Sequence, residues 1–455
     1  MRSATLTTST AERLGFQFNP SVFLCVAGVI LPNALSLGAL VFGIGSPPRP
    51  AAIMGYATVA IIARFAPPLI TVLLYLATAA YDAVSTIALL FNLAPSEIGL
   101  ALHLGAELRL FSSPLYIALA TGLAALVAIN LTVLTRKRDL LRRGNPALMM
   151  GFAVAFMVAD FLANTSAHYQ FGTLYGAGKP MESAGEASGF RAATLGKTNR
   201  HMLLVVVEAL GHFADPARQA LLLQPFADPD LAKRYEVTTG TTTYYGSTTA
   251  AEMRELCNTR EPYQALLEKE LVCLPSEMAS RGYQTASLHN FTSAFFGRNQ
   301  WYPKLGFEKR FFASDLKAGA QRLCGGPFRG PCDADVVPFI EARLREAKKP
   351  TFFYWMTLST HVPIAPQEGT PRLACERGGG RIGHVEVCYM TEMWLDLWEA
   401  VVRMTREMPA MEILLVGDHA PPLWSKAGRQ LFTPGLVTWI RLHPRAAALP
   451  SRPRP

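Results

Sequence analysis

The pattern of apolar residues divides the chain near residue 165 into two parts. The first part contains long apolar stretches at residues 20–45, 51–63, 67–93, 114–134 and 146–163. A helix needs about 20 apolar residues to cross a bilayer, and several stretches reach this length. The second stretch is short and ends at Arg64, so it could form one broken crossing with the third. The pattern predicts a transmembrane helix bundle over residues 1–165, with about five spans in a range of about three to five.

The second part of the chain alternates short apolar runs with amphipathic segments. Four runs are continuous, as is typical of strands buried on both faces: residues 202–207, 352–358, 413–416 and 436–442. Amphipathic patterns predict helices at residues 263–271, 337–347 and 390–404. This alternation predicts an α/β sandwich.

Polar segments surround and interrupt the predicted α/β domain, which covers residues 199–444. Residues 166–198 are predicted to be a linker from the membrane anchor. Residues 238–249 are rich in Thr, Gly, Ser and Tyr, which predicts an exposed loop. Residues 445–455 are rich in proline and arginine, which predicts a disordered tail.

Composition and charge agree with a membrane protein. Charged residues make up 17% of the chain and hydrophobic residues 50%, and the mean hydropathy is +0.20, which excludes intrinsic disorder. The net charge of +9 would also suit nucleic-acid binding. However, the densest basic run, residues 136–143, lies between two apolar stretches, where membrane proteins place a cytoplasmic loop. We therefore expect no nucleic-acid partner, and we expect residues after 165 to lie across the membrane.

Two carboxylates fall within apolar stretches. Asp82 and Asp160 would be costly to bury in lipid, and such residues indicate a function by default. Alternatively, each lies near a helix end. No basic residue is obviously placed as a partner for either one.

The cysteines support the same topology. Cys25 falls in the first apolar stretch, and the other six all follow residue 165: Cys257, Cys273, Cys324, Cys332, Cys375 and Cys388. An even number on an oxidising side predicts disulfides. Six cysteines allow about 15 pairings, and we expect sequential pairing because each neighbouring pair brackets a short loop. Their spacing does not suggest a structural zinc cluster.

Residues with metal-binding side chains follow three predicted strands. Glu208 ends the run LLVVV, His361 ends the run FYWMTLST, and Asp418 and His419 end the run ILLVG. In α/β sheets, ligands bind beyond the carboxyl ends of the strands. Taken singly, each acid could be a helix cap. Together, carboxylates and imidazoles at one sheet edge predict a site for Zn²⁺ or Mn²⁺.

Five ordered motifs resemble a known family. They read NRHMLLVVVEALG, GSTTAAE, LHNFTSAFFGR followed by WYPKLGF, TLSTHVPI, and GDHAPP. In this order they resemble the membrane-anchored sulfatase-like transferases of the alkaline phosphatase superfamily. Lipoteichoic acid synthases are the nearest members in this resemblance, and lipid A phosphoethanolamine transferases are more distant.

The resemblance implies a role for each matching residue. Glu208, Asp418 and His419 match metal ligands, and Thr248 matches a threonine nucleophile that also contacts the metal. The positions that hold the substrate phosphate match His289, Arg298 and His361. The neighbouring hydroxyls of Ser247 and Thr249 leave the nucleophile open on the residues alone.

The implied activity is transfer of a phosphorylated headgroup, phosphoglycerol or phosphoethanolamine, from a membrane phospholipid to an envelope glycan or lipid. One Mn or Zn ion would assist, a phosphothreonine would be the intermediate, and the catalytic domain would lie in the periplasm of a bacterial inner-membrane protein. The chain departs from the synthases at Phe296 and Gly297, where they typically have Trp-Asn. Glu252, four residues after Thr248, slightly favours the phosphoglycerol branch.

Two alternatives stay open at this point. The domain could be a phosphodiesterase or sulfatase-like hydrolase, although the soluble half has no Cys/Ser-x-Pro-x-Arg signature, which disfavours sulfate-ester hydrolysis. It could also be a non-catalytic receptor or envelope scaffold. The remaining histidines of the soluble part are expected to be structural: His201, His212, His384 and His443. The oligomeric state is open.

Overall fold

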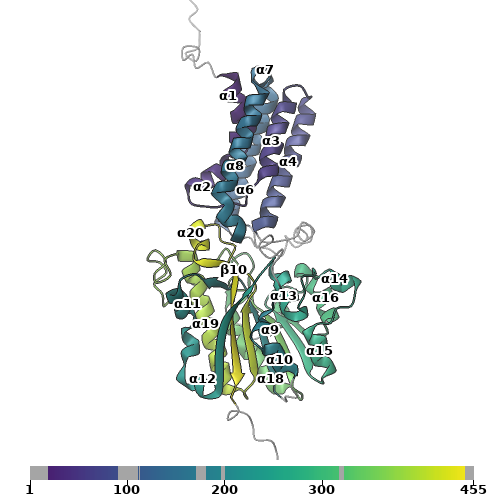
Figure 1. Cartoon of the computed structure of the whole chain (residues 1–455), viewed down its shortest axis with the longest axis vertical. Helices are drawn as coiled ribbons and strands as arrows, with labels where there is room; N and C mark the ends of the chain where they lie inside the picture. The colour runs from purple at the N-terminus through teal and green to yellow at the C-terminus, as the bar shows by residue number, and fades with distance from the viewer. Residues whose placement is uncertain are drawn as a thin grey trace, which may run out of the picture. The chain divides into compact units, whose positions relative to one another are not determined.

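The computed structural model describes residues 19–90, 111, 113–170, 181–195, 200–316 and 322–445. It contains two compact units. The helical unit falls within Met1–Gly38, Pro48–Ala83 and Ala120–Ala163, and the α/β unit contains the remaining residues (Figure 1). The predicted tail at residues 446–455 and part of the predicted linker lie outside the described residues.

The N-terminal helices are apolar and mostly begin at proline. Their bounds are α1 (Pro20–Cys25), η2 (Val26–Ile30), α2 (Ala34–Val41), α3 (Pro50–Ala63), α4 (Pro68–Leu90), α6 (Pro114–Arg136), α7 (Arg138–Arg143) and α8 (Pro146–Gln170). Proline suits the first helical position because its missing N–H would have no partner there. Of the described helices, α4, α6 and α8 are long and apolar enough to span a membrane.

The first apolar stretch does not form one straight helix, although its apolar pattern is uninterrupted. It breaks between Ile30 and Ala34, and the two halves are bent by 74°, so they count as one further span at most. The second stretch forms α3, which has only 14 residues. The described residues therefore supply three to four candidate spans, and the count of about five stays a prediction.

Asp82 has a basic partner, contrary to the sequence-based expectation. Arg49 Nη1 lies 2.7 Å from Asp82 Oδ2, and Arg49 Nη2 donates to Asn33 Oδ1 at 2.7 Å. Tyr56 also donates to Asp82, while the backbone N–H of Arg49 donates to Asp160 Oδ2 at 3.0 Å. A charge in an apolar unit is costly unless it is paired in this way. Both carboxylates are thus tied to the start of α3, which favours a structural role for them.

The α/β unit is built on a mixed sheet in which the central strands are parallel. The sheet has the order β2-β10-β9-β1-β8-β4-β5, and β3 also pairs with β10. The bounds are β1 (Met202–Val207), β2 (Gly211–Phe213), β3 (Tyr235–Thr243), β4 (Gln284–His289), β5 (Lys309–Phe312), β8 (Thr351–Met356), β9 (Glu412–Gly417) and β10 (Phe432–Pro444). A small second sheet pairs β6 (Leu323–Cys324) with β7 (Gly330–Pro331).

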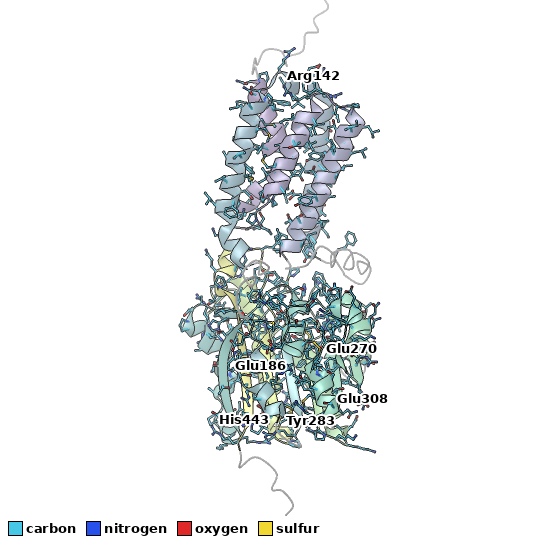
Figure 2. All side chains as sticks on the ribbon, turned by 45° about the vertical axis from the view of Figure 1, so that its right-hand side comes forward. Arg142, Glu186, Glu270, Tyr283, Glu308 and His443 are labelled. Atoms are coloured by element: carbon cyan, nitrogen blue, oxygen red, sulfur yellow. A yellow bond between two sulfur atoms is a disulfide. The ribbon has the colours of Figure 1, made fainter. Side chains whose placement is uncertain are left out.

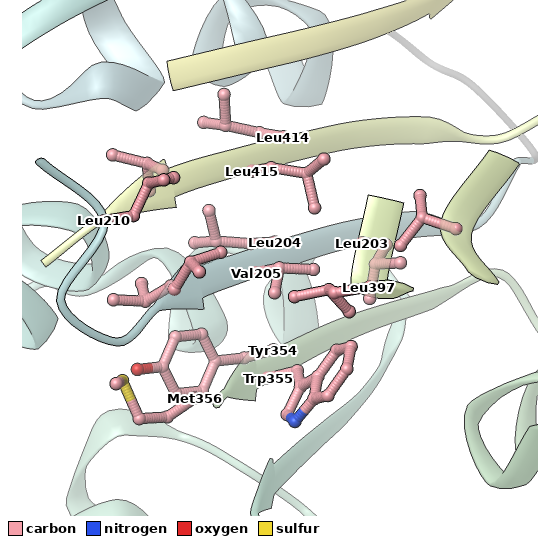
Figure 3. Packing of buried hydrophobic residues seen from close by; sticks show 14 of the residues in the cluster. Leu203, Leu204, Val205, Leu210, Tyr354, Trp355, Met356, Leu397, Leu414 and Leu415 are labelled. Carbon is pink, nitrogen blue, oxygen red and sulfur yellow. The ribbon is translucent and has the colours of Figure 1, made fainter. Parts of the chain in front are cut away.

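The central strands are buried on both faces because their sequences are almost entirely apolar after their first residues. All residues of β1, β8 and β9 are buried, as expected for parallel strands covered by helices. Side chains from neighbouring strands pack against one another along the sheet, including Leu204, Trp355 and Leu415 (Figure 3). The four predicted strands are confirmed, with shifts of a few residues at their ends.

Helices complete the α/β unit. They are α9 (Ala184–Ala187), α10 (Phe190–Leu195), α11 (Pro216–Leu223), η4 (Gln224–Ala227), α12 (Pro229–Arg234), α13 (Thr248–Cys257), α14 (Ala265–Glu268), α15 (Leu274–Ser280), η5 (Phe295–Gly297), α16 (Arg298–Leu305), α17 (Ala313–Leu316), α18 (Asp333–Glu346), α19 (Val385–Glu407) and α20 (Lys426–Arg429). The predicted helices at 337–347 and 390–404 correspond to α18 and α19. The predicted helix at 263–271 is wrong for most of its length, because only Ala265–Glu268 is helical.

The predicted exposed loop at residues 238–249 is also wrong. Half of it, residues 238–243, belongs to β3, which pairs antiparallel with β10 from Tyr235 to Thr243. Threonine is β-branched and suits a strand, and the partner strand β10 supplies the hydrogen bonds that a loop would lack. The rest of the segment leads into α13, which begins at Thr248.

The structure pairs the six cysteines of the α/β unit sequentially. The disulfides are Cys257–Cys273, Cys324–Cys332 and Cys375–Cys388. Cys25 remains a free cysteine of the helical unit. In the helical unit, the basic residue Arg142 of α7 lies at one end of the helices (Figure 2).

Candidate metal centre and phosphate site

Three side chains with metal-binding atoms meet beyond the carboxyl ends of β1 and β9. Glu208 follows β1, and Asp418 and His419 follow β9, the parallel neighbour of β1 in which Gly417 pairs with Val207. The ligand atoms of the three residues all lie within 4.8 Å of one another, and all three residues are buried. The sheet therefore brings together residues that are far apart along the chain, at the edge where the sequence placed the site.

Thr248 contributes a hydroxyl to the same cluster. Its Oγ1 lies 3.0 Å from Asp418 Oδ2, 3.4 Å from Glu208 Oε2 and 3.5 Å from His419 Nε2. The two neighbouring hydroxyls instead contact each other, with 3.0 Å between Ser247 Oγ and Thr249 Oγ1. Among these three hydroxyls, the geometry favours Thr248 as the one that acts at the cluster.

Backbone groups orient the ligand atoms. Asp418 Oδ1 accepts the N–H groups of Ala209 at 2.7 Å and His419 at 2.6 Å, so its Oδ2 is directed to Thr248. His419 Nδ1 lies 3.0 Å from the carbonyl of Ala420. A carbonyl only accepts, so Nδ1 carries the proton and Nε2 keeps its lone pair for a ligand.

The chemistry of this donor set fits a divalent ion. Two carboxylates, an imidazole nitrogen and a hydroxyl are ligands that Zn²⁺ and Mn²⁺ accept. Burial, followed by the charge of Asp418, raises the pKa of Glu208 well above its usual range. Two carboxylates this close repel each other, and a cation between them would relieve that repulsion.

Two of the residues expected to hold phosphate interact electrostatically with the cluster: Arg298 with Glu208, and His361 with His419. His289 ends β4, and burial, followed by the charge of Arg298, lowers its pKa. His361 follows β8, and burial lowers its pKa to about 4, with a smaller contribution from His419. Arg298 also opposes the rise in the pKa of Glu208. The site therefore offers two neutral imidazoles and one guanidinium near the carboxylates.

Both imidazoles are oriented by carbonyl groups. His289 Nδ1 lies 3.2 Å from the carbonyl of Met356, and its buried Nε2 has no hydrogen-bond partner. His361 Nδ1 lies 2.9 Å from the carbonyl of Val362, and the ring centroid of Phe328 lies 3.7 Å from that of His361. A buried unpaired nitrogen is costly, so His289 is suited to receive a polar ligand such as a phosphate oxygen.

Arg298 is held by Glu252, a residue that the sequence showed only as a spacing marker. Arg298 donates to Glu252 Oε2 through Nη2 at 2.8 Å and through Nε at 3.2 Å, and it also donates to the carbonyl of Phe295. Tyr354 donates to Glu252 Oε1 at 3.0 Å, and Tyr302 donates to the same atom. Glu252 and Arg298 are both almost fully buried. Glu252 lies one turn after Thr248 on α13, so one helix carries the hydroxyl and the anchor of the guanidinium.

Asp333 is a second residue that sequence reasoning missed. Its carboxylate accepts from Asn290 Nδ2 at 2.7 Å, from Leu358 N at 3.1 Å and from Ser359 N at 3.0 Å. These groups directly follow His289 or shortly precede His361, so Asp333 joins the two segments that carry the imidazoles. Burial raises its pKa to about 7. In the sequence it resembles any acid at the start of a helix.

The other histidines have structural contacts. His201 accepts the N–H of Thr351, His212 contacts the hydroxyl of Thr438, His384 accepts the N–H of Val387 at the start of α19, and His443 pairs with Glu412. None of these partners belongs to the cluster around Thr248. Their contacts agree with the structural role expected from the sequence.

Replacing Glu252 with glutamine should weaken phosphate binding. The amide cannot balance the charge of Arg298, so the guanidinium would lose its fixed position. We expect the Kd for inorganic phosphate, measured by calorimetry with Mn²⁺ present, to rise about tenfold or more, equivalent to about 1.4 kcal/mol. Glu412→Gln is a matched control, because Glu412 is equally buried and pairs with Arg441 at the opposite end of β9. Equal phosphate affinity in both variants would contradict this role.

Comparison with known proteins agrees with the fold. Residues 201–379 match the family model described as Sulfatase. This range contains Glu208, Thr248, His289, Arg298 and His361, and it ends before Asp418 and His419. No curated protein matches the chain.

Several solved structures resemble the chain at low identity. A lipoteichoic acid synthase from Listeria monocytogenes is 14% identical, with 54% of this chain and 65% of that chain covered and a TM-score of 0.42. A phosphoglycerol transferase from Streptococcus pyogenes is 16% identical, with 53% and 68% covered and a TM-score of 0.39. An integral-membrane lipooligosaccharide phosphoethanolamine transferase from Neisseria meningitidis is 12% identical, with 74% and 69% covered and a TM-score of 0.41. The match to the family model covers less than half of the chain and shows that residues 201–379 are similar to sulfatases, in agreement with the resemblance of the motifs.

Proposed function

We propose that this protein transfers a phosphorylated headgroup from a membrane phospholipid to a glycan or lipid acceptor, through a phosphothreonine at Thr248. The observation that carries this proposal is the position of Thr248 Oγ1, within 3.5 Å of atoms of Glu208, Asp418 and His419. A threonine hydroxyl is a weak nucleophile unless a base or cation activates it. A carboxylate of the cluster could act as the base and a bound ion as the cation, and both would lie next to Thr248 Oγ1.

Glu208, Thr248, Asp418 and His419 would hold one divalent ion, Mn or Zn. When bound, the ion would lower the pKa of the Thr248 hydroxyl and offset negative charge at the reacting phosphate. Arg298 would bind the phosphate oxygens with its guanidinium, and His289 and His361 would direct their Nε2 sides to them.

The transfer proceeds in two balanced steps. In the first, Thr248 Oγ1 forms a bond to phosphorus while the bond from phosphorus to the diacylglycerol oxygen breaks. The hydroxyl proton leaves toward Asp418 Oδ2, the nearest acceptor at 3.0 Å, and the diacylglycerol oxygen takes up a proton. In the second, an acceptor hydroxyl attacks the phosphothreonine, loses its proton and releases Thr248 as the free hydroxyl.

The membrane setting supports a lipid donor. Among the described residues, three apolar helices long enough to span a bilayer precede the domain, and anchoring near a lipid raises the effective concentration of that lipid at the site. The three disulfides of the α/β unit suit an oxidising compartment. We therefore place the domain on the periplasmic side of a bacterial inner membrane, with the basic loop in the cytoplasm.

The test uses the full chain in detergent with Mn²⁺ or Zn²⁺. It is incubated with phosphatidylglycerol or phosphatidylethanolamine labelled in the headgroup, with and without glycan or lipid acceptors. We expect release of diacylglycerol from one donor and label on an acceptor. Label released only to water would replace the transferase by a phosphodiesterase, and no diacylglycerol from either donor would overturn the proposal in favour of a non-catalytic domain.

A further inference from the structure

Arg254 connects the helix that carries Thr248 to the loop that carries the metal-binding side chains. We infer that Arg254 is a positioning residue, which fixes Asp418 relative to Thr248 through bonds to the backbone. This inference rests on the proposed function, because it concerns the geometry of the same cluster.

Two contacts of Arg254 fall on the last residue of β9 and on the residue that follows it. Its Nη2 donates to the carbonyl of Gly417 at 2.8 Å, and its Nη1 donates to the carbonyls of Asp418 at 3.3 Å and Thr243 at 3.4 Å. Its Nε donates to Glu255 Oε1 at 2.6 Å. Arg254 has no exposed side-chain surface. A guanidinium has about five N–H donors in one plane, so most of them are used and the side chain has one orientation.

The bond from Arg254 to the carbonyl of Asp418 adds to other bonds that hold this residue. Its N–H donates to the carbonyl of Val207 at 3.1 Å, and its Oδ1 accepts the N–H of Ala209 at 2.7 Å. Arg254 then holds the carbonyl of the same residue. With the backbone held on both sides and one carboxylate oxygen occupied, Oδ2 is directed to Thr248.

Glu255 keeps Arg254 in place. A buried guanidinium needs a counter-ion, and Glu255 is as fully buried as Arg254. The carboxylate of Glu255 also accepts the N–H groups of Ala184 and Gly185, each at 3.1 Å. Glu255 is therefore held at three points, and the pair cannot turn away from the loop without breaking several buried bonds.

A second arginine provides a matched control. Arg234 also donates to backbone carbonyls, those of Thr405, Arg406 and Met408 at the end of α19. Arg234 lies where β3 starts, next to the last residue of β10, and it has no described contact with Asp418 or Thr248. A lysine at either position keeps the charge but loses the planar set of donors.

The experiment compares Arg254→Lys with Arg234→Lys in the full chain, stripped of metal and titrated with Mn²⁺ in detergent. We expect the Kd for Mn²⁺ to rise about 10- to 100-fold in Arg254→Lys, as is typical when a residue that orients a ligand is changed. We expect Arg234→Lys to lower the unfolding temperature and to leave the Kd within about twofold of wild type. Equal Mn²⁺ affinity in Arg254→Lys and wild type would overturn the inference.

Glu255→Gln keeps the inference testable if Arg254→Lys does not fold. The amide leaves Arg254 without its counter-ion, so we expect a smaller rise of the Kd, about threefold to tenfold. An unchanged Kd in Glu255→Gln would then overturn the inference. Wild-type protein that binds no Mn²⁺ or Zn²⁺ would instead overturn the proposed function, so the two failures are distinguishable.

Discussion

Replacing Asp418 with alanine should remove the bound divalent ion and lower headgroup transfer about a thousandfold, equivalent to about 4 kcal/mol in the barrier. Asp418 Oδ2 is the carboxylate atom nearest to Thr248 Oγ1, and it also lies 3.3 Å from His419 Nε2. Its loss leaves one carboxylate, one imidazole and the neutral hydroxyl of Thr248, which is a weak ligand, so we expect the site to lose its ion. Metal content by mass spectrometry and turnover of labelled phospholipid, measured on the same preparation, check both effects.

Asp396→Ala is the control for this variant. Asp396, on α19, is also largely buried, and it pairs with Arg372 rather than with the cluster. We expect it to retain one ion per chain and most of the activity. An Asp418→Ala protein that keeps stoichiometric metal and normal turnover would place the ion elsewhere.

Replacing Thr248 with alanine should abolish transfer and retain the ion. Three protein ligands remain in the variant, so we expect the Kd for Mn²⁺ to change less than about tenfold. We expect turnover to fall on the order of 10³- to 10⁴-fold, since no nucleophile is left to form the covalent intermediate. Steady-state kinetics and metal titration of the same protein separate the two effects.

The neighbouring hydroxyls supply the controls for Thr248. Ser247→Ala and Thr249→Ala should retain most activity, because these hydroxyls contact each other in the structure. Wild-type protein mixed with donor lipid and no acceptor should carry the phosphorylated headgroup, phosphoglycerol or phosphoethanolamine, on Thr248 by peptide mass spectrometry. The same group on Ser247 or Thr249 instead would contradict the assignment.

The sequence predicted the strands that are buried, because burial requires a run of apolar residues. β1, β8 and β9 lie in the middle of the sheet, so each contains a continuous apolar run bounded by polar residues. The same rule located Glu208, Asp418 and His419, because they directly follow such runs. β3 was missed because its residues are only partly buried and its strand character depends on pairing with β10, which no local pattern reveals.

The residues that support the site depend on contacts between distant segments. Arg298 and Glu252 are 46 positions apart. Arg254 reaches the carbonyl of Gly417 across 163 positions. Backbone carbonyls carry no sequence signal, so the role of Arg254 can be read only from the folded chain. By contrast, Thr248 was located in advance by the resemblance of its motif to a known family.

The most direct test is a crystal structure of the full chain grown with Mn²⁺, in which anomalous scattering locates the ion. We expect one ion bound by Glu208, Asp418 and His419, with Thr248 Oγ1 in its coordination sphere at about 2.0–2.2 Å. An ion bound elsewhere, or one from which Thr248 Oγ1 lies beyond about 3 Å, would contradict the assignment of this cluster as the metal centre.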